Sequence, residues 1–210
     1  MNVWEVKDVC TKVLDGIGMY YVGNNLLLKK LLASGLANGH ILFEDYPGLG
    51  KTLLAKVFAR VTGCTWGRVQ FTPDLMAADI LGTRVWRMAE SKFVLEKGPI
   101  FTNILLADEI NRSPPKTQSA LLEAMEERQV TIEGETHKLS APFFVIATQN
   151  PIELEGTYPL PEAQMDRFLI KLSMGYVPTK AEESLILKRR IGWRRDDPTN
   201  FIKPVTDQAL

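Results

Sequence analysis

The stretch that decides the fold is Ile41-Leu42-Phe43-Glu44-Asp45-Tyr46-Pro47-Gly48-Leu49-Gly50-Lys51-Thr52. A short apolar run leads into two glycines and a lysine, and a helical pattern follows. Gly48 and Gly50 let the backbone approach an anion and turn N–H groups toward it. Lys51 adds a positive charge, Thr52 offers a hydroxyl to magnesium, and the helix that begins here directs its positive dipole end at the same place. The stretch therefore predicts a phosphate-binding loop between a strand and a helix.

One position departs from the general loop pattern G-x-x-x-x-G-K-[ST]. Asp45 stands where that pattern has its first glycine. Aspartate tolerates a left-handed backbone better than most residues, so the turn remains feasible. We expect its carboxylate near the phosphates, where its charge is a mild cost.

A second apolar run ends in two carboxylates. Residues 104–107 are typical of a buried strand, and Asp108 and Glu109 follow directly. Sheets of α/β proteins place ligands at the carboxyl ends of their strands. There Asp108 can hold magnesium through hard oxygen ligands, and Glu109 can polarise a water for attack on a γ-phosphate. The alternative is a pair of surface carboxylates at a strand end.

Two further polar residues are candidates for the same site. Asn150 follows the apolar run 143–148 and can orient the same water. Its alternative role is that of a turn residue before Pro151. Arg167 ends a short helical segment, and taken alone it is most simply a surface ion-pair partner.

Strands that alternate with helices predict a parallel sheet with helices on both faces. Gly16, Gly18 and Gly23 predict breaks in the N-terminal helices, and Ser113 is expected to cap a helix whose first turn contains proline. A capping box of Thr179 and Glu182 predicts a helix that runs to about residue 190. The predicted strands are 40–43, 68–71, 104–107, 143–148 and 168–172, the predicted helices are 3–17, 24–37, 52–61, 113–127, 161–166 and 179–190, and hairpins are predicted within 72–98 and 129–140.

Composition limits the classes of function. The 210 residues include 25 basic and 25 acidic side chains, so the net charge is zero, which argues against a general nucleic-acid or membrane-surface binder. Two cysteines and two histidines form no structural metal set, and they fit a reducing compartment. The first residues show no signal pattern, and no apolar run is long enough to cross a membrane. We therefore expect a cytoplasmic protein that does not bind membranes.

Taken together, the motifs resemble the MoxR family of AAA+ ATPases from about residue 22 to residue 190. The resemblance implies a P-loop NTPase core of α/β class, with a five-stranded parallel sheet flanked by helices. Residues 72–98 would be its helix-2 insert, and 129–140 the hairpin before sensor 1. The motifs that carry the resemblance are Gln70-Phe71-Thr72-Pro73-Asp74-Leu75, Leu105-Leu106-Ala107-Asp108-Glu109-Ile110-Asn111-Arg112, Ala147-Thr148-Gln149-Asn150-Pro151, Asp166-Arg167-Phe168, and the segments 39–45, 121–130 and 155–164.

The resemblance also implies a role for each matching residue. Lys51 and Thr52 would be the Walker A residues, and Asp108 and Glu109 the Walker B pair. Thr52 and Asp108 would hold Mg²⁺, and the catalytic residues would be Glu109, Asn150 as sensor 1, and Arg167 as an arginine finger inserted into a neighbour's site. Contacts to ATP or ADP are expected from Val22, Gly23, Pro47, Gly48, Leu49, Gly50, Lys51, Thr52 and Leu53.

Family members are regarded as chaperone-like ring ATPases. The resemblance thus implies a homo-oligomer, most simply a hexamer, which works with a von Willebrand A-type protein or a client enzyme to insert a metal cofactor or mature the client. Residues 1–190 would form the nucleotide-binding domain, and 191–210 a linker and the start of a lid that is mostly lacking.

Two alternatives remain open from the sequence. The chain can be a nucleotide-gated scaffold with little hydrolysis, because the helical lid and its sensor-2 arginine are expected to be missing. It can also be a nucleic-acid motor, since Lys188-Arg189-Arg190-Ile191-Gly192-Trp193-Arg194-Arg195 combines basic residues with an aromatic ring. A solvated, basic helix end explains the same run, so a nucleic-acid partner is not expected.

Overall fold

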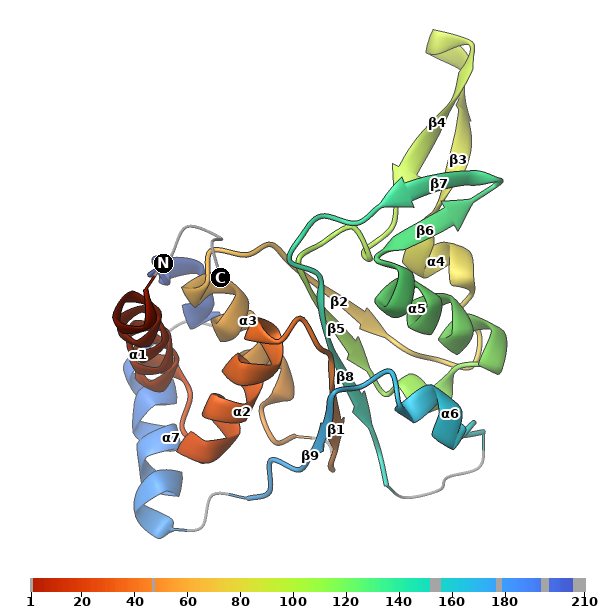
Figure 1. The fold of residues 1–210 in the computed structure, drawn as a ribbon. Coiled ribbons are helices and arrows are strands. Elements are labelled where there is room, and N and C mark those ends of the chain that lie inside the picture. Colours follow the sequence, from red (N-terminus) through yellow and green to blue (C-terminus); the bar gives the residue numbers. More distant parts are fainter. Residues whose placement is uncertain (1, 47, 152–155, 177–178, 194–196, 206–210) are drawn as a thin grey trace.

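A computed structural model describes residues 2–46, 48–151, 156–176, 179–193 and 197–205. At its centre lies a five-stranded sheet with strand order β2-β5-β8-β1-β9 (Figure 1). Every pairing in this sheet is parallel, which confirms the predicted fold class. The strands are β1 (Ile41–Glu44), β2 (Trp66–Gln70), β5 (Ile104–Asp108), β8 (Phe144–Gln149) and β9 (Ile170–Leu172).

The central strands are apolar because both of their faces are covered. Alternate side chains point to opposite faces of a strand. On β1, Ile41 and Phe43 pack into one apolar cluster and Leu42 into the other. Strands buried in this way read as continuous apolar runs rather than as alternating ones.

Helices form a layer on each side of the sheet (Figure 1). The last described residues pack against the layer with the N-terminal helices. Ile202 is buried there, and the N–H of Val205 donates to Val61 O at 2.8 Å. The first layer holds α1 (Val3–Tyr20), α2 (Asn25–Leu36) and α3 (Lys51–Val61), with α7 (Lys180–Trp193) beside α1, and the second holds α4 (Ala77–Leu81), α5 (Pro115–Glu127) and α6 (Glu162–Met165). Within the described part of the chain, no helix is both long and apolar enough to cross a membrane.

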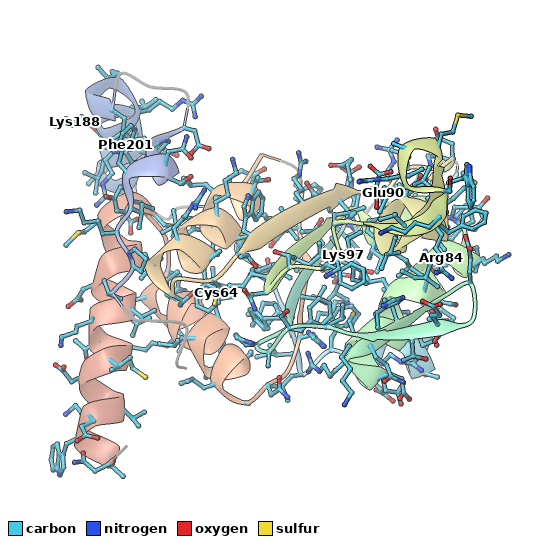
Figure 2. All side chains as sticks on the ribbon, turned by 90° about the horizontal axis from the view of Figure 1, so that it is seen from above. Cys64, Arg84, Glu90, Lys97, Lys188 and Phe201 are labelled. Atoms are coloured by element: carbon cyan, nitrogen blue, oxygen red, sulfur yellow. The ribbon has the colours of Figure 1, made fainter. Side chains whose placement is uncertain are left out.

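Two antiparallel hairpins extend from the end of the sheet where the parallel strands begin (Figure 1). The first pairs β3 (Gly82–Arg87) with β4 (Lys92–Lys97), and the second pairs β6 (Gln129–Ile132) with β7 (Glu135–Lys138). Arg84, which Figure 2 labels on the first hairpin, forms an ion pair with Glu135 of β7 at 3.0 Å, and this contact joins the two hairpins. Both predicted hairpins are confirmed.

Two local predictions are wrong. Gly16 and Gly18 lie inside α1, and a Cβ added to Gly16 would lie 3.0 Å from the Val61 side chain on α3. The glycine thus allows the two helices to pack closely. Ser113 does not cap α5: its hydroxyl donates to Ile110 O at 3.4 Å, and Pro114 takes the N-cap position. The capping box of Thr179 and Glu182 is confirmed by reciprocal hydrogen bonds at the start of α7.

Candidate nucleotide-binding site

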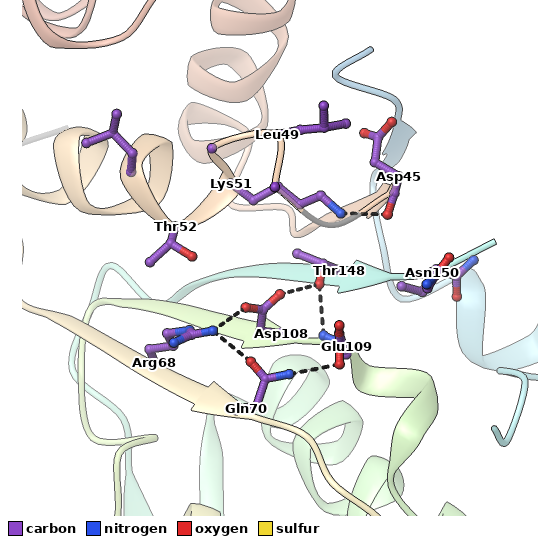
Figure 3. Close-up of a pocket in the computed structure, with 14 residues that line it drawn as sticks. Asp45, Leu49, Lys51, Thr52, Arg68, Gln70, Asp108, Glu109, Thr148 and Asn150 are labelled. Carbon is purple, nitrogen blue, oxygen red and sulfur yellow. Dashed lines mark hydrogen bonds and ion pairs between the residues drawn. The ribbon is translucent and has the colours of Figure 1, made fainter. Parts of the chain in front are cut away.

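A cleft of about 460 Å³ opens where β1, β5 and β8 end (Figure 3). Its walls come from the loop before α3 on one side and from the tip of β5 on the other. The predicted phosphate loop and the predicted acidic strand tip therefore face the same space. The lining residues are Asp45, Gly48, Leu49, Gly50, Lys51, Thr52, Leu53, Arg68, Gln70, Asp108, Glu109, Thr148, Gln149 and Asn150.

The loop has the backbone that the sequence predicts. Gly48 and Gly50 both have positive φ, +88° and +83°, which glycine adopts without steric cost. Gly50 precedes the first residue of α3, so the N-terminus of this helix opens into the cleft. Lys51 Nζ donates to the backbone oxygen of Asp45 at 2.8 Å. Pro47 lies outside the described residues.

Burial lowers the pKa of Lys51, and the carboxylates of Asp45, Asp108 and Glu109 oppose this shift. The ammonium group is thus surrounded by negative charge on the side of the acidic tip. An anionic ligand in the cleft would add to that surrounding charge and would strengthen the hold of Lys51 on its proton.

Asp45 lines the cleft, but its backbone conformation and the contacts of its carboxylate differ from what the sequence suggests. Asp45 does not have a positive φ, so this position does not require a left-handed backbone. Its buried carboxylate is also turned away from the loop. Oδ1 accepts from Ser173 Oγ at 2.7 Å, and Oδ2 accepts from the N–H of Met174. Asp45 therefore ties the phosphate loop to the segment that follows β9.

The acidic tip is built around Thr148 of β8. Its hydroxyl donates to Asp108 Oδ1 at 2.7 Å and accepts from the N–H of Glu109 at 2.8 Å (Figure 3). Glu109 has φ +57°, a left-handed conformation that costs about 1–3 kcal/mol for a non-glycine residue. Strain of this kind gathers at functional sites, where the surrounding contacts maintain it.

Two residues of β2 that the sequence reasoning missed complete the tip. Arg68 Nη2 donates to Asp108 Oδ2 and to Gln70 Oε1, each at 2.7 Å, and Gln70 Nε2 donates to Glu109 Oε2 at 3.0 Å (Figure 3). Arg112 adds an ion pair to Glu109 Oε2 at 2.9 Å. The two-residue spacing of Arg68 and Gln70 places both side chains on one face of a strand. Only the pairing of β2 with β5, which sets Gln70 beside Asp108, shows that this face is next to the acidic tip.

The remaining predicted contacts lie around the cleft. Asn150 lines it, as expected, whereas Gln149 turns toward β1 and donates to Glu44 Oε1 at 2.7 Å. Val22 and Gly23 do not line the cleft. The buried Tyr21 ring lies close to Gly23 and also to Gly50 of the phosphate loop. A Cβ added to Gly23 would lie 2.4 Å from this ring, and a Cβ added to Gly50 would lie 3.7 Å from it. Burial, with the nearby Asp45 carboxylate, raises the pKa of Tyr21 to about 12.

Comparison with known proteins agrees with this geometry. Residues 40–170 match the model of the ATPase family associated with various cellular activities (AAA). The chaperone MoxR1 of Mycobacterium tuberculosis is 55% identical over 168 residues, which are 80% of this chain and 44% of that protein. This chain belongs to the MoxR family of AAA ATPases.

Two further similarities extend over more of this MoxR-family chain. YeaC of Bacillus subtilis, an uncharacterized protein, is 50% identical over 194 residues, which are 92% of this chain and 59% of YeaC. A crystal structure from Cytophaga hutchinsonii superposes with a TM-score of 0.85 at 43% identity, covering 96% of this chain and 60% of the other. The chain thus spans between 44% and 60% of the length of these relatives.

Arg167, the expected arginine finger of a MoxR-family protein, lies outside the cleft. Its Nε and Nη2 both contact Glu126 Oε2 on α5, at 2.8 and 2.7 Å, and its side chain is one-third exposed. The structure therefore does not bring Arg167 to the cleft of its own chain.

The cleft suits a magnesium ion better than a metal held entirely by protein. Thr52 and Asp108 both line it, and both offer the oxygen ligands that Mg²⁺ prefers. Among the described residues no cluster of three or more His, Cys, Asp or Glu side chains could enclose a metal. Mg²⁺ commonly binds through one or two protein oxygens, with phosphate oxygens and water as the other ligands.

Proposed function

We propose that this MoxR-family chain binds ATP with Mg²⁺ in the cleft and hydrolyses it to ADP and phosphate. The observation that carries the proposal is that the glycine loop with Lys51 and the acidic tip with Glu109 line one cleft. Phosphoryl transfer to water needs little covalent chemistry from a protein, which mainly positions the reactants and neutralises charge. The cleft has a group for each of these tasks.

Each group has a specific proposed task. The loop amides, the N-terminus of α3 and Lys51 would hold the phosphates. Bound magnesium, held by Thr52 and Asp108, would supply further charge neutralisation. Glu109 would accept a proton from the attacking water while Asn150 orients that water. Because Gln70 and Arg112 both contact Glu109 Oε2, Oε1 is the oxygen best placed to receive the proton.

The proposal includes assembly with further copies of the chain. Arg167 lies away from its own cleft, which supports a role in the site of a neighbouring subunit. A homo-oligomeric ring, most simply a hexamer, would give every cleft such an arginine. Arginine fingers typically contribute ~10³–10⁵ in rate, so an isolated subunit should be nearly inactive.

We further propose that ATP turnover drives chaperone-like maturation of a client in the cytoplasm, for example insertion of its metal cofactor. The name of the relative MoxR1 as a chaperone supports this. The hairpins β3–β4 and β6–β7, which extend away from the cleft, would contact the client or a von Willebrand A-type partner (Figure 1). Residues 1–190 would serve as the nucleotide-binding domain and 191–210 as a linker and the start of a lid.

Phosphate release measured over a range of protein concentrations tests the enzymatic proposal. Turnover per subunit should rise with concentration as rings form. Arg167→Ala should retain ATP binding and lose ~10³-fold or more in turnover. Mixing it with the Lys51→Ala variant, which should bind ATP ~10–100-fold more weakly, should restore part of the activity. Unchanged ATP affinity in Lys51→Ala would contradict the assignment of the loop.

Two other functions predict different results. A nucleotide-gated scaffold would bind ATP with no concentration-dependent phosphate release. A nucleic-acid motor would need the aromatic ring of the basic run 188–195 to stack on a base. Trp193 instead stacks on Tyr20 of α1, with ring centroids 6.4 Å apart, which favours a structural role for this tryptophan.

A further inference from the structure

The proposed magnesium ligand already has a positively charged partner. Asp108 Oδ2 accepts from Arg68 Nη2 at 2.7 Å, and Oδ1 accepts from Thr148 Oγ1 at the same distance (Figure 3). Both carboxylate oxygens are therefore engaged by groups of the chain itself.

Of the two ion-pair partners, Arg68 is the one with room to move. Its side chain is 43% exposed, whereas that of Asp108 is 16% exposed and is also held by Thr148. Arg68 projects from β2, an edge strand of the sheet, and it lines the cleft. A cation that approaches Asp108 from the cleft can thus displace the guanidinium group without moving the carboxylate.

Arg68 is also linked to Glu109. The nitrogen that contacts Asp108 contacts Gln70 Oε1 as well, and the Gln70 amide donates to Glu109 Oε2. The N–H of Glu109 donates to Thr148 Oγ1, which closes a ring of hydrogen bonds through Asp108 (Figure 3). Release of Arg68 from Asp108 therefore removes one of the contacts that orient Gln70 toward Glu109.

We propose that Arg68 is the resident counter-cation of Asp108 and competes with Mg²⁺ for Oδ2. This inference rests on the proposed function in one respect, the assignment of Asp108 as a magnesium ligand. In the absence of nucleotide Arg68 neutralises the carboxylate and weakens the binding of free Mg²⁺. A nucleotide would supply phosphate oxygens as further ligands for the metal, so that Arg68 would give up Oδ2 and the Gln70 contact to Glu109 would lose one of its supports. Metal binding thereby depends on nucleotide binding.

The test compares wild type with Arg68→Met, which keeps much of the aliphatic stem and removes the charge. Each protein is titrated with Mg²⁺ alone, followed by thermal unfolding, and with Mg²⁺ at a fixed concentration of a fluorescent ADP, followed by nucleotide binding. The variant should reach half-maximal response at ~10-fold lower Mg²⁺ in both titrations, because a charge-assisted contact no longer competes. Arg112→Met is the matched control. It removes the same charge from Glu109 instead of Asp108, and its Mg²⁺ midpoint should stay close to that of wild type.

A further variant locates the metal. Adding Asp108→Asn to Arg68→Met should abolish the gain in Mg²⁺ affinity. An unchanged Mg²⁺ midpoint in Arg68→Met, or a gain that survives Asp108→Asn, would overturn the proposal. So would weaker ADP binding by Arg68→Met without Mg²⁺, since it would make Arg68 a ligand of the nucleotide. Wild-type protein that binds no ADP at any Mg²⁺ concentration would refute the proposed function, and the titration with Mg²⁺ alone would still decide the role of Arg68.

Discussion

The two ends of the parallel sheet use polar residues in different ways. At the carboxyl ends of β1, β5 and β8, polar groups line an open cleft, and the ion pairs of Arg68 and Arg112 there are partly exposed to solvent. At the amino ends of the same strands, polar side chains are buried and bind backbone groups of neighbouring strands. His40 is 3% exposed and Asn103 is 5% exposed.

The contacts at the amino end are well satisfied. His40 Nδ1 accepts from the N–H of Val145 at 2.9 Å, so Nε2 carries the proton that points to Met125 O at 3.1 Å. Asn103 accepts from both the N–H and the hydroxyl of Thr65 and donates to Pro142 O at 3.0 Å. Buried polar groups without such partners would cost about 1–3 kcal/mol each.

This difference teaches that polarity alone does not identify a functional site. The exposed carboxyl end can rearrange around a ligand, whereas the buried amino end holds the strands in register. Substitutions at the carboxyl end should therefore alter chemistry and leave stability nearly unchanged, and those at the amino end should do the reverse.

The largest effect is expected from Glu109→Gln. Loss of a general base lowers turnover by ~10²–10⁴-fold, while the phosphate loop continues to bind ATP. The free energy of unfolding should change by less than about 1 kcal/mol, because Glu109 lies at the solvent-accessible edge of the cleft. Phosphate release, nucleotide titration and denaturant unfolding measure the three quantities. A large loss of stability would remove the distinction between the two ends.

At the amino end, acid should destabilise the fold through His40. Burial lowers its pKa from 6.5 to about 4, and the Arg128 guanidinium acts in the same direction. The folded state thus binds fewer protons than the unfolded state between these pH values, so stability is lost as the pH falls from 6.5 to 4. The loss from this group is about 3 kcal/mol.

Denaturant unfolding at a series of pH values measures this loss. His40→Gln, which has no titrating group, should lose correspondingly less stability over the same interval. Equal pH dependence in the variant and the wild type would assign the acid sensitivity to other groups and leave His40 without the predicted role.

Asn103→Ala should have a smaller effect on the same property. The variant leaves the Thr65 N–H and Pro142 O without their side-chain partner, which costs about 1–3 kcal/mol. Turnover per folded molecule should not change. Thr65→Val removes the partner hydroxyl, so the two substitutions should be non-additive in a double-mutant cycle. Additive losses would show that the two residues do not act together.

The same contrast explains how much of the fold and of the candidate site could be predicted from the sequence. The phosphate loop and the acidic tip are each continuous in sequence, and the structure places both in the walls of one cleft. Asp45 with Ser173, Arg68 with Asp108, and His40 with Val145 join residues 128, 40 and 105 positions apart. Predicting such pairs requires knowledge of which strands lie side by side in the sheet. The partners of the Asp45 carboxylate could not be predicted for this reason, since they follow the last strand of the sheet.

The smallest effect is expected from Lys171→Met. This variant tests whether the burial of a contact, rather than its position at one end of the sheet, determines how much the contact stabilises the fold. Lys171 of β9 pairs with Glu44 of β1 at 2.7 Å near the carboxyl end, and this contact is the main cause of the lowered pKa of Glu44. The side chains are 48% and 33% exposed, and exposed pairs contribute only about 0–1 kcal/mol. Neither residue lines the cleft, so turnover should not change either. Thermal unfolding at low and high salt measures the first quantity, and phosphate release the second. A loss comparable to that of Asn103→Ala would mean that charged contacts at the carboxyl end also hold the sheet together, and stability would then no longer distinguish its two ends.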